Sequence, residues 1–309
     1  MATVNTAWDH VSSNRFKTYL IMFFFSLFTV GVIYVFAQAL GYGNMGALGI
    51  LGVSFIVAGI MNFVSYFYSD KIVLGISGAK PVKKETNPGL YRLVENLTIA
   101  AGLPVPKIYV LEDTAPNAFA TGRDPKHAAI AYTTGILDKL NKQELEAVTA
   151  HELSHVGNRD TLVMTVVSVL VGTIALLSDY FMRMLWFGGG DRDSDNKGNA
   201  IFMVVAIVAA ILAPIVATLI QLAVSRKREF LADASGSILT RNPEALATAL
   251  MKISGDKEPL EAANRGTAHL YIVNPLKGSQ AVDWFASLFN THPPVEARVK
   301  ALREMSGNI

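Results

Sequence analysis

The stretch TYLIMFFFSLFTVGVIYVFAQALGYGNMGALGILGVSFIVAGIMNFVSYFYS, residues 18–69, contains no Asp, Glu, Lys or Arg. A helix needs about 20 predominantly apolar residues to cross the hydrocarbon core of a bilayer. The stretch provides two such lengths, residues 18–40 and 45–66, and the turn-forming sequence GYGN separates them at 41–44. It therefore predicts a transmembrane helical hairpin with a short turn on the far side of the membrane.

A second pair of apolar runs lies further along the chain. Residues 161–178 are apolar, a polar loop (GGGDRDSDN) follows at 188–196, and residues 199–225 again lack Asp, Glu, Lys and Arg. These lengths favour a second transmembrane hairpin over residues 161–224. A buried soluble hairpin, or one that lies in the membrane interface, is the alternative that this pattern leaves open.

The composition excludes several classes of protein. Of the 309 residues, 51% are hydrophobic and 17% are charged, whereas soluble domains contain about 25% charged residues. A chain this apolar is not intrinsically disordered. Lys and Arg total 27 against 25 Asp and Glu, which argues against nucleic-acid binding. Because the chain has no cysteine, disulfides, a Cys nucleophile and a Cys-based metal site are excluded.

Basic residues flank the apolar runs mainly on one side, and cytoplasmic loops are enriched in Lys and Arg. The turn at 41–44 has no charge, and three Asp offset Arg192 and Lys197 in the loop at 188–198. The flanking residues are Arg15, Lys17, Lys71, Arg159, Arg226, Lys227 and Arg228. A cleaved signal peptide that ends at AQA, 37–39, is disfavoured because the next apolar run follows at once. The predicted organisation is a cytosolic N-terminus (1–17), a transmembrane hairpin (18–68), the first part of a cytosolic domain (69–160), a second transmembrane hairpin (161–224) and the second part of that domain (225–309).

The cytosolic segments carry the patterns of a small α+β domain. Asn87 and Pro88 open a predicted helix that Gly102 closes, and Asn141 with Glu144 forms a capping-box pattern for another helix. We therefore predict a polytopic, mainly helical α+β protein with a small β-sheet. The remaining predictions are strands at 107–112, 117–122 and 127–135, a turn at 123–126, and helices that begin at 242–243 and 293–294.

Residues 151–155 read HELSH on the helix that follows this capping box. His151 and His155 lie on one helix face, where two neutral imidazoles can bind one Zn²⁺. Glu152 is rotated from His151 by about 100°, so it can act as a general base on a water at the metal without being a ligand. A solvated helix with two unrelated histidines is the alternative interpretation.

A catalytic zinc needs a third protein ligand and one open position. Glu229 and Asp233 are four residues apart in RKREFLAD, 226–233, so Glu229 can be the ligand and Asp233 can accept a hydrogen bond from a ligand histidine, His151 being the expected one. A surface pair of acidic residues fits the spacing equally well. The predicted hairpin decides between them, because it returns Glu229 to the side of the membrane that holds His155.

These motifs together resemble the HtpX family of membrane-embedded zinc metalloproteases, which are of the gluzincin type. The resemblance covers nearly the whole chain. The matching stretches are HELSH (151–155), EFLAD (229–233) after a membrane hairpin, NAFATG (117–122), THPP (291–294) and the N-terminal hairpin.

The resemblance implies a heat-shock-associated endopeptidase in the bacterial inner membrane, with its active site facing the cytosol. The implied task is quality control of damaged or misfolded membrane proteins, beside an ATP-dependent membrane protease. His151, His155 and Glu229 would hold one Zn²⁺ per chain, and Glu152 would be the general base. Asp233 would support the ligands from behind, and Asp160 would brace the site or pair with a nearby Arg.

Two further sites have both a functional and an ordinary interpretation. Asn117, Ala118, Phe119 and Ala120 could form an edge strand whose main chain pairs with an extended substrate, or simply a strand of the sheet. His292 could stabilise the oxyanion of the tetrahedral intermediate, or it could cap the following helix.

Three other functions are to be weighed against this one. A prenyl-protein processing protease would share the ligand pattern but usually carries more than four spans. An intramembrane protease would bury HELSH in an apolar run, whereas Glu144, Glu146 and Asp160 surround it here. A non-enzymatic membrane scaffold or transporter would bind no metal.

Overall fold

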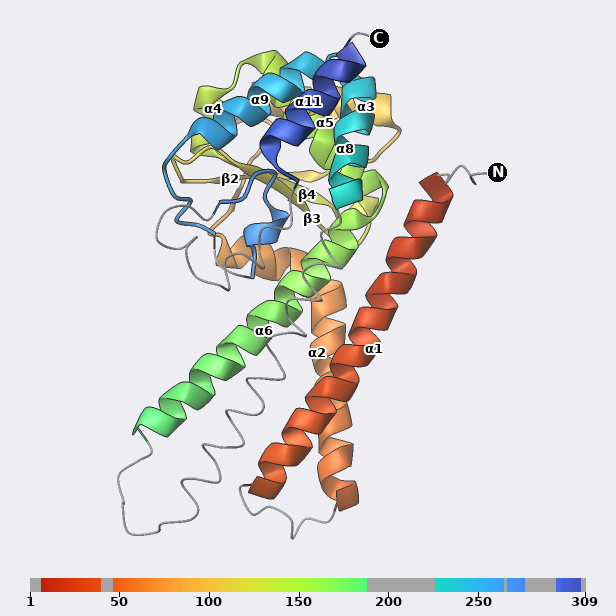
Figure 1. Ribbon diagram of the computed structural model, residues 1–309, viewed down its shortest axis with the longest axis vertical. Coiled ribbons are helices and arrows are strands. Elements are labelled where there is room, and N and C mark those ends of the chain that lie inside the picture. Colours follow the sequence, from red (N-terminus) through yellow and green to blue (C-terminus); the bar gives the residue numbers. More distant parts are fainter. Residues whose placement is uncertain (1–6, 40–46, 188–225, 264–265, 276–292, 307–309) are drawn as a thin grey trace.

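The computed structural model describes residues 7–39, 47–187, 226–263, 266–275 and 293–306; within these ranges it does not describe the side chains of residues 7–10, 35–39, 47 and 174–187. Two long helices come first, α1 (Ala7–Ala39) and α2 (Ala47–Ile76), and they lie side by side, mostly below the part of the molecule that holds the sheet (Figure 1). Both are long and apolar enough to cross a membrane, over Val11–Tyr34 and Leu48–Ile76. The predicted turn at 41–44 and most of the second predicted hairpin lie outside the described residues.

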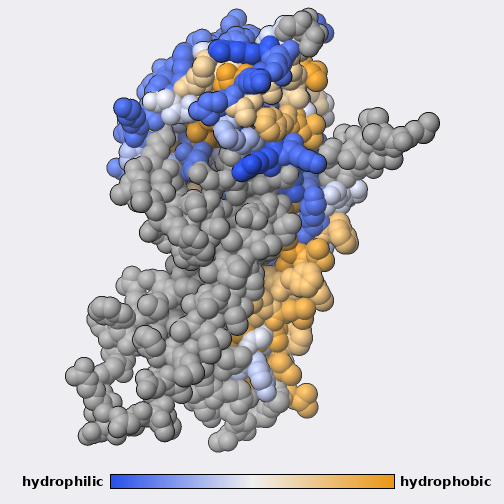
Figure 2. All heavy atoms as spheres, in the orientation of Figure 1, coloured by the Kyte–Doolittle hydropathy of each residue, from blue (hydrophilic) through white to orange (hydrophobic). Residues whose placement is uncertain are grey.

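The outer surface of α1 and α2 is apolar. Phe16, Phe23 and Phe24 of α1 and Leu48 and Ile56 of α2 are all more than half exposed. Figure 2 shows these apolar side chains along the right side of the lower part of the molecule, whereas the upper part has a mixed surface with many hydrophilic residues. Between the two helices, Asn62 of α2 donates hydrogen bonds to Met22 O and Ser26 Oγ of α1.

The upper part is a helical domain around a small mixed sheet with the strand order β1-β2-β4-β3. β4 (Ala129–Thr133) runs parallel to β2 (Lys107–Leu111) and antiparallel to β3 (Ala118–Thr121), which forms one edge. The register pairs Ile108 with Ile130 and Ala120 with Ile130. The short β1 (Lys80–Pro81), which the sequence did not predict, pairs antiparallel with β2 at the other edge.

The remaining helices surround this sheet. They are α3 (Pro88–Ala101), α4 (Thr134–Lys139), α5 (Lys142–Gly157), α6 (Asp160–Phe187), α8 (Arg226–Thr240), α9 (Pro243–Gly255) and α11 (Val295–Ser306), with short 3₁₀ turns η2 (Pro125–His127) and η3 (Ala268–Leu270).

Several local predictions are confirmed by the caps. Asn87 accepts a hydrogen bond from Leu90 N, and Gly102 ends α3 with a left-handed φ of 65°. Asn141 and Glu144 form both hydrogen bonds of the capping box at the start of α5. The predicted mainly helical fold with a small sheet is confirmed.

The predicted strand over 127–135 is wrong at both ends. At its start, the Asp124 side chain accepts hydrogen bonds from Lys126 N and His127 N, so this segment forms the 3₁₀ turn η2. At its end, the Thr133 hydroxyl caps Ile136 N and starts helix α4. Short side chains that accept from the backbone two or three residues on favour turns and helix starts over strands.

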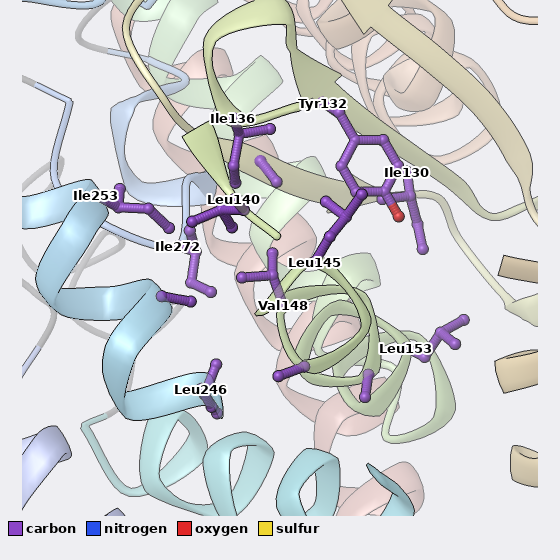
Figure 3. Close-up of a cluster of buried hydrophobic side chains, with 14 of the residues drawn as sticks. Ile130, Tyr132, Ile136, Leu140, Leu145, Val148, Leu153, Leu246, Ile253 and Ile272 are labelled. Atoms are coloured by element: carbon purple, nitrogen blue, oxygen red, sulfur yellow. The ribbon is translucent and has the colours of Figure 1, made fainter. Parts of the chain in front are cut away.

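The two faces of the sheet contact different cores because successive residues of a strand point to opposite faces. Ile130 and Tyr132 of β4 belong to one buried core with Leu145 and Val148 of α5 and Leu246 of α9 (Figure 3). Ala129 and Ala131 of β4 contact the second core, which includes Leu162 and Val166 of α6 and Val73 of α2. The sheet therefore joins the long apolar helices to the helices that carry the candidate site.

Candidate metal centre

Helix α5 places His151 and His155 one above the other inside the domain. Both side chains are buried, and their Nε2 atoms lie 3.2 Å apart. The rings stand edge to face with centroids 4.7 Å apart. The two imidazoles thus point their Nε2 atoms at a common position, as the four-residue spacing predicts.

Helix α8 brings Glu229 to the same position from 74 residues further along the chain. Glu229 Oε1 lies 3.5 Å from His155 Nε2, and Glu229 Oε2 lies 3.8 Å from His151 Nε2. One ligand atom from each of the three residues lies within 4.8 Å of the other two. The close approach of α8 to α5 depends on Gly236, where a Cβ would lie 2.9 Å from His151 N.

A second layer of carboxylates lies behind the histidines. Asp233 Oδ1 is 2.9 Å from His151 Nδ1, and Asp160 Oδ2 is 3.0 Å from His155 Nδ1. Each carboxylate favours a proton on Nδ1, which leaves the Nε2 lone pair of that ring directed at the shared position. Two lone pairs and the Glu229 carboxylate that converge on one point fit a bound cation, and two His with one carboxylate are a donor set typical of catalytic zinc.

The ionisation of the buried pair supports this interpretation. Burial lowers the pKa of His151, despite the opposing effect of Asp233. Burial also opposes the charged form of His155, but the hydrogen bond to Asp160 and the charge of Glu229 outweigh it and raise the pKa of His155 to about 9. The His155 imidazole is therefore protonated in the metal-free protein, and a divalent cation would displace that proton.

Glu152 lies beside this centre with an altered acidity. Burial raises the pKa of the Glu152 carboxyl to about 7, with a further contribution from the charge of Glu229. The backbone N–H of Ala120 faces this carboxylate and partly opposes the rise in its pKa. A carboxyl group that gains and loses a proton near neutral pH suits the part of a general base.

Sequence reasoning missed Arg298, which is fully buried on α11. Its Nε and Nη2 donate to the two oxygens of Asp233 at 2.8 and 2.6 Å, and its Nη1 donates to Ile272 O and lies 3.6 Å from Glu229 Oε2. Asp233 is thereby held in place from both sides. The available signal was that Arg298 lies on the same face of α11 as Leu302, which is also buried.

Edge strand β3 lies next to Glu152, but part of its outer edge is occupied. Ile272 N donates to Ala118 O at 3.0 Å, and the Asn117 side chain donates to Val273 O at 2.9 Å. The Phe119 ring is buried and packs edge to face against Tyr271, with ring centroids 5.0 Å apart. The predicted substrate role of residues 117–120 stays a prediction, centred now on Ala120.

The remaining predicted site residues divide into two groups. Asp160 contacts both groups named in its prediction, since its carboxylate lies 3.0 Å from His155 Nδ1 and 3.4 Å from Arg228 Nε, and its part in the reaction stays a prediction. His292 lies outside the described residues, so its role in oxyanion stabilisation stays a prediction.

A His-Glu-x-x-His helix joined to a distant Glu beside two long apolar helices defines a membrane-associated metalloprotease. The sequence pattern of peptidase family M48 matches residues 84–306. The chain is 45% identical over 300 residues to the Protease HtpX homolog of Dictyoglomus thermophilum, and this alignment covers 97% of this chain and 95% of the relative. Its identity to the Protease HtpX homolog of Pyrococcus furiosus is 46% over 292 residues, 94% of this chain and 95% of the relative.

The chain therefore belongs to the HtpX-type membrane metalloproteases of peptidase family M48. The crystal structure of S. mikatae Ste24p is similar in fold, with a TM-score of 0.50 and 18% sequence identity. The similarity covers 88% of this chain and 62% of the Ste24p chain.

Proposed function

We propose that this protein is a zinc-dependent endopeptidase whose single Zn²⁺ is held by His151, His155 and Glu229. The observation that carries the proposal is the convergence of these three side chains, with their ligand atoms within 4.8 Å and a carboxylate behind each histidine. Bound at such a site, Zn²⁺ lowers the pKa of a water toward 7 and polarises the scissile carbonyl.

Glu152 performs the proton transfers in this proposal. Its carboxylate takes a proton from the attacking water and passes it to the nitrogen of the leaving amine. Burial keeps the carboxyl pKa of Glu152 close to neutral, so both the uptake and the release of the proton are accessible to it. The Ala120 N–H that contacts this carboxylate orients it and ties β3 to the reaction site.

The substrate is expected to bind as an extended strand along β3. Ala118 and Ala120 present their main-chain groups to the same outer edge, because peptide groups alternate along a strand. Ala118 O already accepts from Ile272 N and the Ala120 N–H faces Glu152, so the Ala120 carbonyl is the group with which a substrate main chain would pair. Main-chain pairing recognises many sequences, which suits a protease of broad specificity.

The proposed setting is the cytosolic face of the bacterial inner membrane, where the chain would be multi-pass. The domain continues into α6, and His155 lies five residues before Asp160, where that helix begins. Basic residues such as Lys17 and Lys71 follow the positive-inside pattern for cytosolic ends. Membrane proteins that are damaged or misfolded under stress are then the expected substrates, with an ATP-dependent membrane protease as the expected partner.

The zinc content and peptidase activity of the purified full-length protein and its Glu152→Gln variant test the proposal. We expect about one zinc per chain in both proteins, and cleavage of casein or of the protease itself only in the wild type. Activity that persists in Glu152→Gln would refute the assigned base. A wild-type protein that binds no zinc would refute the proposed metal site.

A further inference from the structure

Asn14 is a buried polar residue on α1, one turn before the charge-free apolar run. Its side chain is only 3% exposed. The Nδ2 group donates to Asp160 Oδ1 at 2.8 Å and to the backbone oxygen of Asn158 at 2.9 Å. The first helix of the membrane hairpin therefore reaches the loop that joins the HELSH helix to α6.

The partner of Asn14 is the same carboxylate that supports His155. Asp160 is 1% exposed, and its other oxygen, Oδ2, lies 3.0 Å from His155 Nδ1. Arg228, on helix α8, also contacts this carboxylate: its Nε lies 3.4 Å from Oδ1. Because Asn14 holds Oδ1, rotation of the carboxylate is restricted, and Oδ2 stays within hydrogen-bond distance of His155 Nδ1.

Asn14 is itself held by the helix that carries it. The Thr18 hydroxyl donates to Asn14 O at 2.9 Å, and α1 packs along both α2 and α6. A shift of α1 relative to the domain would therefore withdraw the Nδ2 donor from Asp160.

We propose that Asn14 is a positioning residue for the metal centre: by holding Asp160 it orients His155, so that α1 is part of the metal site as well as a membrane anchor. The inference rests on the proposed function, in which His155 is a zinc ligand. Removal of a group that hydrogen-bonds directly to a metal-bound histidine, as Asp160 does to His155, typically changes metal affinity by about 10- to 100-fold. The loss of Asn14, which lies one hydrogen bond further out, should fall at the lower end of that range. A purely structural tie between α1 and the domain would change stability but not affinity.

The test compares Asn14→Ala and Asn14→Asp with a matched control, Asn62→Ala, in the full-length protein in detergent. Asn62 is also an interhelical asparagine of the hairpin, donating to Met22 O and Ser26 Oγ, but it does not touch Asp160. We measure the Zn²⁺ dissociation constant by competition with a chromophoric chelator and the visible absorption spectrum of the Co²⁺-substituted protein. Melting of the metal-free proteins reports any loss of fold separately.

We expect Asn14→Ala to weaken Zn²⁺ binding by about tenfold and to change the Co²⁺ spectrum. Asn14→Asp should weaken binding at least as much, because it replaces the donor with a second carboxylate. Asn62→Ala should leave the Zn²⁺ affinity within about twofold of the wild type. In an Asp160→Ala background, Asn14→Ala should add no further loss, because the residue acts only through Asp160.

Two results would overturn the inference alone: a wild-type affinity in Asn14→Ala, or an equal loss from Asn14→Ala with and without Asp160. A wild-type protein that binds no Zn²⁺ would overturn the proposed function and this inference with it.

Discussion

Gly236→Ala should disturb the metal centre although Gly236 touches neither metal nor substrate. Gly236 lies seven residues after Glu229 on α8, which places both on one helix face. A Cβ at this position would lie 2.9 Å from His151 N and 3.1 Å from both Ala150 C and His151 Cα. These atoms belong to the backbone of α5, so they cannot turn aside as a flexible side chain would.

The magnitude follows from this geometry. Carbon atoms in contact sit about 3.5–4.0 Å apart, so α8 and α5 must separate by roughly half an ångström. Overpacking of this kind costs about 1–3 kcal/mol, while replacing a helical Gly by Ala returns up to about 1 kcal/mol. The net loss of folding stability is therefore about 0–2 kcal/mol. The shift carries Glu229 away from the two histidines, and sites held less tightly than about 0.5 Å lose function.

The assay is the Zn²⁺ dissociation constant of the purified variant, with peptidase activity measured at saturating zinc. We expect Zn²⁺ binding to weaken by at least about tenfold, a loss typical of disturbed ligand support. Gly89→Ala is the matched control, because a Cβ there meets only Asn87 Oδ1 at 3.9 Å, on helix α3. A Gly236→Ala protein with wild-type zinc affinity would refute the argument that this contact sets the position of Glu229.

Further predictions concern stability. Asn141→Ala removes the capping box of α5 and should lower the free energy of unfolding by about 1 kcal/mol; denaturation of Lys142→Ala, an exposed neighbour, provides the control, and equal losses would contradict the prediction. Burial alone would raise the pKa of Asp233, but Arg298 outweighs it and lowers the pKa to about 2, below the unfolded value of about 3.9. Asp233 therefore contributes about 2 kcal/mol above about pH 4, and this contribution is lost as the pH falls toward 2. In the metal-free proteins, the difference in unfolding free energy between wild type and Asp233→Asn should be constant near neutral pH and shrink below about pH 4; a difference that persists undiminished at about pH 3 would contradict this assignment. Excess EDTA should lower the melting temperature of the wild type but not of Glu229→Ala, because zinc stabilises only the protein that binds it; equal shifts in both would contradict a role for Glu229 in binding.

The features that sequence predicted well are those specified within one or two helical turns. Asn87 and Asn141 cap their helices through the backbone three residues on, so short patterns are sufficient to identify them. The charge-free run at 18–69 has the length and composition of two apolar helices, and the structure has α1 and α2 there. The HELSH spacing places the two histidines on one face for the same local reason.

The features that sequence did not predict depend on contacts between distant segments. Arg298 pairs with Asp233 across 65 residues, and Asn14 contacts Asp160 across 146 residues. Nothing near Asn14 in the sequence distinguishes it from a polar residue at the start of an apolar helix. The predicted strand boundaries near His127 and Thr133 were wrong for a different reason. Local side-chain caps favour a turn at one end and a helix start at the other, over the β-propensity of the segment.

Glu229 is an intermediate case, since the four-residue spacing to Asp233 was equally compatible with a surface pair. The prediction depended on a hairpin that returns the chain to the same side of the membrane. In the structure α8 packs directly on α5, and both carboxylates are buried at the histidines.

X-ray absorption at the zinc edge, recorded on the Glu152→Gln protein with and without the additional change Glu229→Ala, tests the joint metal site most directly. We predict one zinc with two imidazole nitrogens at about 2.0–2.1 Å and a carboxylate oxygen at about 2.0–2.2 Å, with the oxygen ligand and most of the affinity lost on Glu229→Ala. A zinc environment that Glu229→Ala leaves unchanged would contradict the claim that α5 and α8 hold the metal together.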